Sequence, residues 1–215
     1  MIIDIVRSNF KIIIFGFVFT FFSCVGQSFF IGLFNSDIRG ELNISHGEFG
    51  TIYGIATLCS SLTLIWLGKK IDDLKLINYS FLVVIFLSFA ALFFSLVNGI
   101  IVLVLGIFFL RLSGQGLMAH TASVGISRYF NQSRGKALSC VWIGMSLGEF
   151  LLPVMIVYFL SFLYWRDVWQ GIAVIILLIL PMFTYFTIKG INKFSRENNN
   201  GDYTNKNIDT VKSWT

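Results

Sequence analysis

Six apolar runs dominate this chain, and each is close to the roughly 20 residues that a helix needs to cross a bilayer. They occupy residues 11–34, 49–67, 76–97, 100–122, 137–161 and 168–188. The polar segments between them are short, so consecutive runs must pair as antiparallel helices. Because only helices and closed barrels can span a bilayer, and runs of this length suit helices, the sequence predicts an all-α integral membrane fold.

Charged residues are too few to form an ordinary water-exposed surface. They make up 13% of the 215 positions, whereas a soluble domain carries about 25%. The net charge of +5 therefore reflects membrane orientation rather than nucleic-acid binding. The three cysteines lie inside apolar runs with no Cys-x-x-Cys pair, which is typical of apolar packing. We expect no cofactor, no metal site and no nucleic-acid partner.

The basic residues predict the orientation of the chain in the membrane. Thirteen of the sixteen Lys and Arg residues lie before or at the first residue of run one, after runs two and four, or after run six. The opposite loops carry only Arg39 and Arg166, and Arg111 lies inside a run. Since cytoplasmic loops carry the excess of Lys and Arg, both termini are expected in the cytoplasm.

Two charged side chains lie near the middle of apolar runs, Arg111 in the fourth and Glu149 in the fifth. A lone charge at that depth costs at least about 2.5–3.5 kcal/mol, so each needs a partner or water. We expect the two to face each other or to share an aqueous cavity; a purely structural ion pair is the alternative. With the amides of Gln27 and Gln115, they are the candidates for contact with substrate or protons.

A densely charged segment, residues 67–75, is expected to form a short cytosolic loop between the second and third spans. It contains Gly68, where a turn would allow close backbone approach, and Asp72 four residues later. Arg128 and Arg134 follow the fourth span on the same predicted side of the membrane.

The polarity of the chain changes abruptly after the last apolar run. We expect residues 1–190 to form the six-span bundle and residues 191–215, which are rich in Asn and charged residues, to form a flexible cytosolic linker or tail. We expect this tail to be the start of a central loop that connects two six-span halves of a longer membrane protein.

Several motifs together resemble the major facilitator superfamily of transporters. Arg111, Gln115 and Gly116 fit its fourth-helix signature Arg-x-x-x-Gln-Gly, and Gly68 with Asp72 fits its Gly-x-x-x-Asp segment between helices 2 and 3. Asp73 and Lys75 depart from that second motif, where a basic residue and a glycine are usual.

Further matches follow the family's order along the chain. The run Arg134-Gly135-Lys136-Ala137 is similar to the start of the family's helix 5, and Gly144-x-x-x-Gly148 partly resembles the antiporter motif, with Glu149 in the place of a proline. The segments 26–30 and 47–50 are similar to bacterial members that resemble organic-anion permeases. Gly26-Gln27-Ser28 also recurs as Gly114-Gln115-Gly116, a short internal echo.

The resemblance implies one half of a twelve-helix fold, built as two inverted three-helix repeats with substrate held near the bilayer midplane. It implies a secondary transporter in a bacterial cytoplasmic membrane, and a second six-helix half from the same gene or a second copy of the chain. Asp72, with Gly68, Arg128 and Arg134, would belong to the cytoplasmic gate. A buried arginine suits a carboxylate, so an organic anion moved by proton symport is the first expectation.

Two other functions stay open at this point. One is a six-span membrane protein or partner subunit that does not transport, which leaves Arg111 and Glu149 unexplained. The other is an intramembrane enzyme, which needs a nucleophile beside a base. Ser113 and His120 are seven residues apart, or about 10 Å along a helix axis, too far for direct activation.

Overall fold

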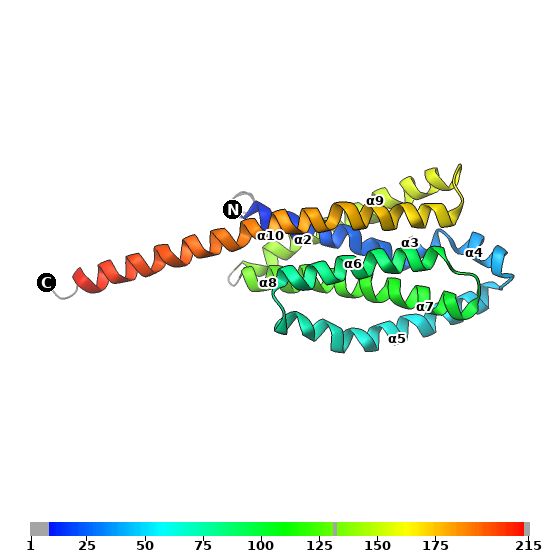
Figure 1. Ribbon diagram of the computed structural model, residues 1–215, viewed down its shortest axis with the longest axis horizontal. Coiled ribbons are helices and arrows are strands. Elements are labelled where there is room, and N and C mark those ends of the chain that lie inside the picture. Colours follow the sequence, from blue (N-terminus) through cyan, green and yellow to red (C-terminus); the bar gives the residue numbers. More distant parts are fainter. Residues whose placement is uncertain (1–8, 131–132, 213–215) are drawn as a thin grey trace.

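The computed structural model describes residues 9–130 and 133–212, with side chains described up to residue 188. Its elements are helical throughout the described residues: α2 (Phe10–Ser23), η1 (Cys24–Gly26), α3 (Ser28–Gly32), α4 (Asn35–Leu42), α5 (His46–Asp73), α6 (Leu76–Ser95), α7 (Ile100–Leu110), η2 (Arg111–Met118), α8 (Ala119–Tyr129), α9 (Arg134–Leu160) and α10 (Trp165–Lys212). Six stretches of the described chain are long and apolar enough to cross a membrane: Phe10–Gly32, His46–Asp73, Leu76–Ser95, Ile100–Tyr129, Arg134–Leu160 and Trp165–Ile188. The predicted all-α, six-span architecture is confirmed (Figure 1).

The charged segment after the second span is helix rather than loop, so that part of the prediction was wrong. α5 begins at a capping box between Ser45 and Glu48 and continues through Gly68 and Asp72 to Asp73. Leu74 is extended (φ −105°, ψ 152°) and ends the helix, and Lys75 immediately precedes α6. Gly68 is buried inside the helix against His120, so its missing side chain serves helix packing and not a turn.

The last helix also differs from the expected irregular tail. α10 continues as helix to Lys212 and extends away from the bundle (Figure 1). The segment after residue 190 contains Asn198, Asn199, Asn200 and Gly201, all weak helix formers, which is why sequence reasoning ended the ordered part earlier. The division into a membrane bundle and a cytosolic tail remains a prediction.

The packing of the spans follows a pseudo-two-fold pattern. In the first three spans, α5 packs on α7 and η2 of span four; correspondingly, α9 of span five packs on α2 of span one. α6 packs behind span four as α10 packs behind span one, and α6 and α10 pack on each other. Exchanging spans one to three with spans four to six leaves this contact pattern unchanged. This is the arrangement expected of two inverted three-helix repeats.

Spans one and four cross where both helices are irregular. Span one contains the 3₁₀ turn η1 followed by the extended residue Gln27 (φ −82°, ψ 156°), and span four contains the π-helical stretch η2. A Cβ on Gly26 would lie 2.3 Å from the Leu110 carbonyl oxygen, and one on Gly114 would lie 2.6 Å from the Gly26 nitrogen. The internal echo in the sequence therefore marks two glycines that meet at the crossing of the two repeats.

The Gly144-x-x-x-Gly148 motif packs α9 against span one. A Cβ on Gly144 would lie 2.2 Å from the Phe17 carbonyl oxygen, and one on Gly148 would lie 2.7 Å from Cys24 Sγ. Thr20 Oγ1 also donates a 2.7 Å hydrogen bond to the Val141 carbonyl across this contact. The motif is thus a small-residue helix interface of the kind that membrane helices use.

Candidate functional site

Arg111 lies at the first position of η2, beside the crossing of spans one and four, and is only 9% exposed. Its NH1 group donates to the Gly26 carbonyl oxygen at 3.3 Å and to Ser28 Oγ at 3.2 Å. Both acceptors belong to the broken part of span one, where the 3₁₀ turn frees a backbone carbonyl from helical pairing. The break in span one, in the first repeat, therefore supplies the hydrogen-bond acceptors for Arg111 of span four, in the second repeat.

Tyr53 of α5 completes the surroundings of the guanidinium. The Arg111 Cζ atom lies 5.4 Å from the centroid of the Tyr53 ring, within cation–π range. The Tyr53 hydroxyl donates to Ser28 Oγ at 3.0 Å, so spans one, two and four meet at one polar cluster. Sequence reasoning missed the roles of Tyr53 and Ser28, because no spacing along the chain links them to Arg111.

The cluster retains unused hydrogen-bonding capacity. Among the described residues, Arg111 Nε and Gln115 Oε1 are buried without a partner. Gln115 is one helical turn after Arg111 in η2, and Gln27 is half-buried in the extended step next to Ser28. Three of the four substrate candidates thus lie at the same break in spans one and four, although contact of their side chains with a substrate stays a prediction.

The expected direct pairing of Arg111 with Glu149 is wrong. The described ion pairs involve Asp72 with Arg128 and Glu41 with Arg166, and Glu149 is exposed. The buried face of α9 consists of Ala137, Val141, Gly144, Gly148 and Ile156. Because Glu149 directly follows Gly148, it lies about 100° further around the helix and off that face. Its predicted place in a shared aqueous cavity stays untested.

At the end of the bundle where α5 terminates, Asp72 and Arg128 form the ion pair of the predicted gate. Arg128 NH2 donates to Asp72 Oδ1, and Arg128 NH1 donates to the Ile71 carbonyl oxygen at 3.1 Å. The Arg128 side chain is 46% exposed and the Asp72 side chain is 66% exposed. Arg134 is the exposed first residue of α9 and takes no part in this pair. Asp72 thus forms an ion pair with Arg128 and not with Arg134.

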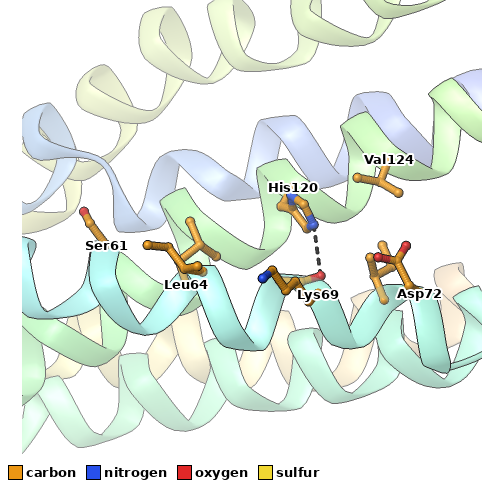
Figure 2. A pocket seen from close by; sticks show the side chains of 9 residues that line it. Ser61, Leu64, Lys69, Asp72, His120 and Val124 are labelled. Atoms are coloured by element: carbon orange, nitrogen blue, oxygen red, sulfur yellow. Dashed lines mark hydrogen bonds between the residues drawn. The ribbon is translucent and has the colours of Figure 1, made fainter.

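A cavity of about 340 Å³ lies beside this ion pair, between α5 and α8. Figure 2 shows His120 reaching from α8 to α5, where its Nε2 atom hydrogen-bonds the Gly68 carbonyl oxygen at 3.1 Å. Lys69 and Asp72 line the same cavity. Three of the four candidate gate residues, Gly68, Asp72 and Arg128, therefore lie at or next to this cavity. His120 is an additional polar group there.

Groups that an intramembrane enzyme would need are engaged elsewhere. Ser113 Oγ donates to the Phe109 carbonyl oxygen at 2.7 Å, while His120 is bonded to Gly68. Within the part of the chain that the structure describes, no group of three or more His, Cys, Asp or Glu side chains could hold a metal ion. Ser113 and His120 thus each hydrogen-bond a backbone carbonyl oxygen and not each other.

A second polar cluster joins three elements at the opposite end of the bundle. Glu41 of α4 accepts hydrogen bonds from Tyr164, Trp165 and Arg166, and Arg166 NH1 also donates to the Ser95 carbonyl oxygen at 3.2 Å. The Arg166 Cζ atom lies 4.3 Å from the Trp165 ring centroid. Burial acts to raise the pKa of Glu41, but the hydrogen bonds from Tyr164 and Trp165 and the nearby Arg166 outweigh it and lower that pKa below its ordinary value. The hydrogen bond to Glu41 raises the pKa of the Tyr164 hydroxyl.

Six membrane-length helices in two inverted repeats, with buried Arg111 at the crossing of the repeats, define a multi-pass helical membrane protein. The family model described as Major Facilitator Superfamily matches residues 16–206, and the chain belongs to this superfamily. It is a multi-pass integral membrane protein and a membrane transporter of the major facilitator type. No match was found among the curated proteins or the solved structures.

Proposed function

We propose that this chain moves a small organic anion across a bacterial cytoplasmic membrane, with protons in symport, by alternating access against a second six-helix half. Both termini face the cytoplasm in this arrangement, as the distribution of basic residues favours. The similarity of segments 26–30 and 47–50 to bacterial members that resemble organic-anion permeases supports this choice of substrate class.

The observation that carries the proposal is that Arg111 is buried without a described counter-ion. The Arg111 residue is only 9% exposed, yet the acceptors of its guanidinium are one backbone carbonyl and one hydroxyl, both on NH1, and no carboxylate is paired with it among the described residues. A buried guanidinium without a counter-ion is costly, and an anionic substrate would supply both the missing charge and hydrogen-bond acceptors. Gln27 and Gln115 beside it would bind the neutral polar part of such a substrate.

Proton coupling is assigned to Glu149 of span five, outside the Arg111 cluster. Glu149 is an acidic side chain near the middle of span five, and acidic side chains inside membrane spans mark the proton relays of transporters. A proton on Glu149 and an anion on Arg111 would then cross the membrane together, and their charges would cancel. This role of Glu149 requires an aqueous route from the bundle surface.

A second half is proposed from the uneven coverage of the spans. In the most apolar window of each span, only 17% of α5 and 22% of α9 are buried, against 33–56% for the other four spans. α5 and α9 occupy equivalent places in the two repeats and flank spans one and four, which carry the Arg111 cluster. A second bundle packed on this side would close the cluster from one membrane face at a time. The alternative, a six-span partner subunit that does not transport, predicts no consequence of losing Arg111.

The test is uptake of radiolabelled mono- and dicarboxylates into vesicles containing the protein, with and without an inward proton gradient. Arg111→Gln should reduce uptake at low substrate concentration by about thirtyfold or more, since losing one partner of a buried charge pair costs at least about 2 kcal/mol. Arg39→Gln, in which a partly buried arginine of α4 loses its hydrogen bond to Asn35, is the matched control and should retain uptake. Unchanged uptake in Arg111→Gln, or uptake of no carboxylate by the parent protein, would overturn the proposal.

A further inference from the structure

A groove of about 560 Å³ runs between α2 and α10, away from the Arg111 cluster and from the ion pair of Asp72 and Arg128. Its size is within the roughly 300–1,000 Å³ range of ligand pockets. Nine residues line it, and all but Lys11 and Thr187 are apolar. Figure 1 shows α10 passing beside α2 at the end of the bundle where the chain begins, and these two helices pack on each other.

The walls of the groove are open and strongly apolar. Phe10 is 56% exposed, Met182 64% and Phe186 62%. Thr187 offers little polarity, because its hydroxyl donates to the Phe183 carbonyl oxygen at 2.8 Å within α10. At membrane depth, a hollow of this kind suits a flexible hydrocarbon chain and not a water-soluble molecule.

One positive charge marks the end of the groove. Lys11 is exposed and, within the described residues, forms no ion pair. It belongs to the first turn of α2, which has no acidic residue, so its charge adds to the positive end of the helix dipole instead of being offset by it. In the sequence, Arg7 precedes it, and Lys189 and Lys193 follow the last span.

We propose that this groove binds one acyl chain of an anionic phospholipid, with the lipid phosphate held at Lys11. The apolar walls select the chain, and the single charge selects the sign of the headgroup. Basic pockets between membrane helices on the cytoplasmic side bind anionic headgroups in this way. The site is independent of the transported substrate, and it would link the start of span one to the end of span six through a bound lipid.

Native mass spectrometry of the full chain, titrated in detergent with phosphatidylglycerol or phosphatidylcholine of identical acyl chains, tests this site. The parent protein should retain phosphatidylglycerol about fivefold more strongly, the preference that one lysine near the headgroup supplies. Lys11→Gln should bind the two lipids equally, whereas Lys11→Arg should keep the preference. Lys75→Gln, at an exposed lysine beside α6 at the same end of the bundle, is the matched control and should also keep it.

A second pair of variants tests the groove itself without changing charge. Met182→Trp places a bulky ring in the groove and should weaken retention of both lipids, while Leu177→Trp, at a 50% exposed position of α10 outside the groove, should not. The circular dichroism spectrum and unfolding temperature of each variant establish that it is folded. A phosphatidylglycerol preference that survives Lys11→Gln would overturn the headgroup assignment. Equal lipid retention by the two tryptophan variants would overturn the assignment to the groove.

Discussion

At the scale of single residues, Asp72 and Arg128 join the end of α5 to α8 through an exposed ion pair. Exposed pairs contribute only about 0–1 kcal/mol to stability, so this contact is better suited to a moving gate than to holding the bundle together. We predict that Asp72→Asn leaves membrane insertion and the unfolding temperature almost unchanged but impairs transport in vesicles.

Asp73→Asn is the matched control for that prediction. Asp73 is the next residue of α5, also exposed, and it has no part in the described ion pair with Arg128. Its amide variant should transport like the parent. If Asp72→Asn instead fails to accumulate in the membrane, Asp72 has a folding role and the gate assignment fails.

The sequence predicted that Arg111 is buried, but it could not predict what the side chain contacts. The depth of a side chain in the membrane follows from counting residues along an apolar run. The direction in which that side chain points depends on which face of its helix is buried. In α9 that face is marked by small residues, Gly144 and Gly148, within a helix that is apolar on every side. The pairing of Arg111 with Glu149 therefore rested on depth alone, and the described ion pairs do not include it.

At the scale of elements, the crossing of spans one and four depends on Gly26 and Gly114 having no side chain. A methyl group on Gly26 would lie 2.3 Å from the Leu110 carbonyl oxygen and 2.6 Å from the Gln115 nitrogen. Both are backbone atoms and cannot rotate away. Gly26→Ala should therefore destabilise the bundle by about 1–3 kcal/mol, measured as the unfolding free energy of the solubilised protein.

Gly32→Ala provides the comparison for Gly26→Ala. Gly32 ends α3 in the same span, and a Cβ there would meet nothing within 4 Å. This variant should match the parent or be slightly more stable, because alanine restricts the unfolded chain. Equal stability of the two variants would contradict close packing at the crossing.

The six spans could be predicted from apolar length, but the irregular turns within them could not. η1 and η2 lie inside continuous apolar stretches, and neither contains a proline to indicate a break. The break in span one is set by close approach to span four, a contact between residues 85 positions apart such as Gly26 and Arg111. The continuation of α5 through its charged end was equally hidden, since Gly68 followed by lysines is a usual signal for the end of a helix.

At the scale of the whole molecule, the two repeats are joined by ion pairs at both ends. Asp72 of span two meets Arg128 of span four at one end. At the other, Glu41, which follows span one, meets Arg166 at the start of span six. Between these ends the repeats meet mainly through close helix packing. The Glu41 cluster therefore closes the end of the bundle opposite the predicted gate, and its strength should affect the entire bundle.

The charge of Glu41 gives this contact a defined pH dependence. Because its hydrogen bonds lower the pKa of Glu41 in the folded protein below the ordinary value of 4.5, the folded state favours the carboxylate. The resulting stabilisation is present above that ordinary value and is lost as the pH falls through the folded pKa. Solvent screening limits it to about 1 kcal/mol or less, since the side chain is 34% exposed.

We therefore predict that the unfolding temperature of the parent exceeds that of Glu41→Gln at about pH 6, and that this gap closes as the pH falls to about 3. Asp37→Asn, which removes an exposed acidic group of the same helix α4 outside the Glu41 cluster, is the comparison variant. A gap between the parent and Glu41→Gln that stays constant over this range would mean that the shape of the Glu41 side chain, and not its charge, joins the two repeats at this end.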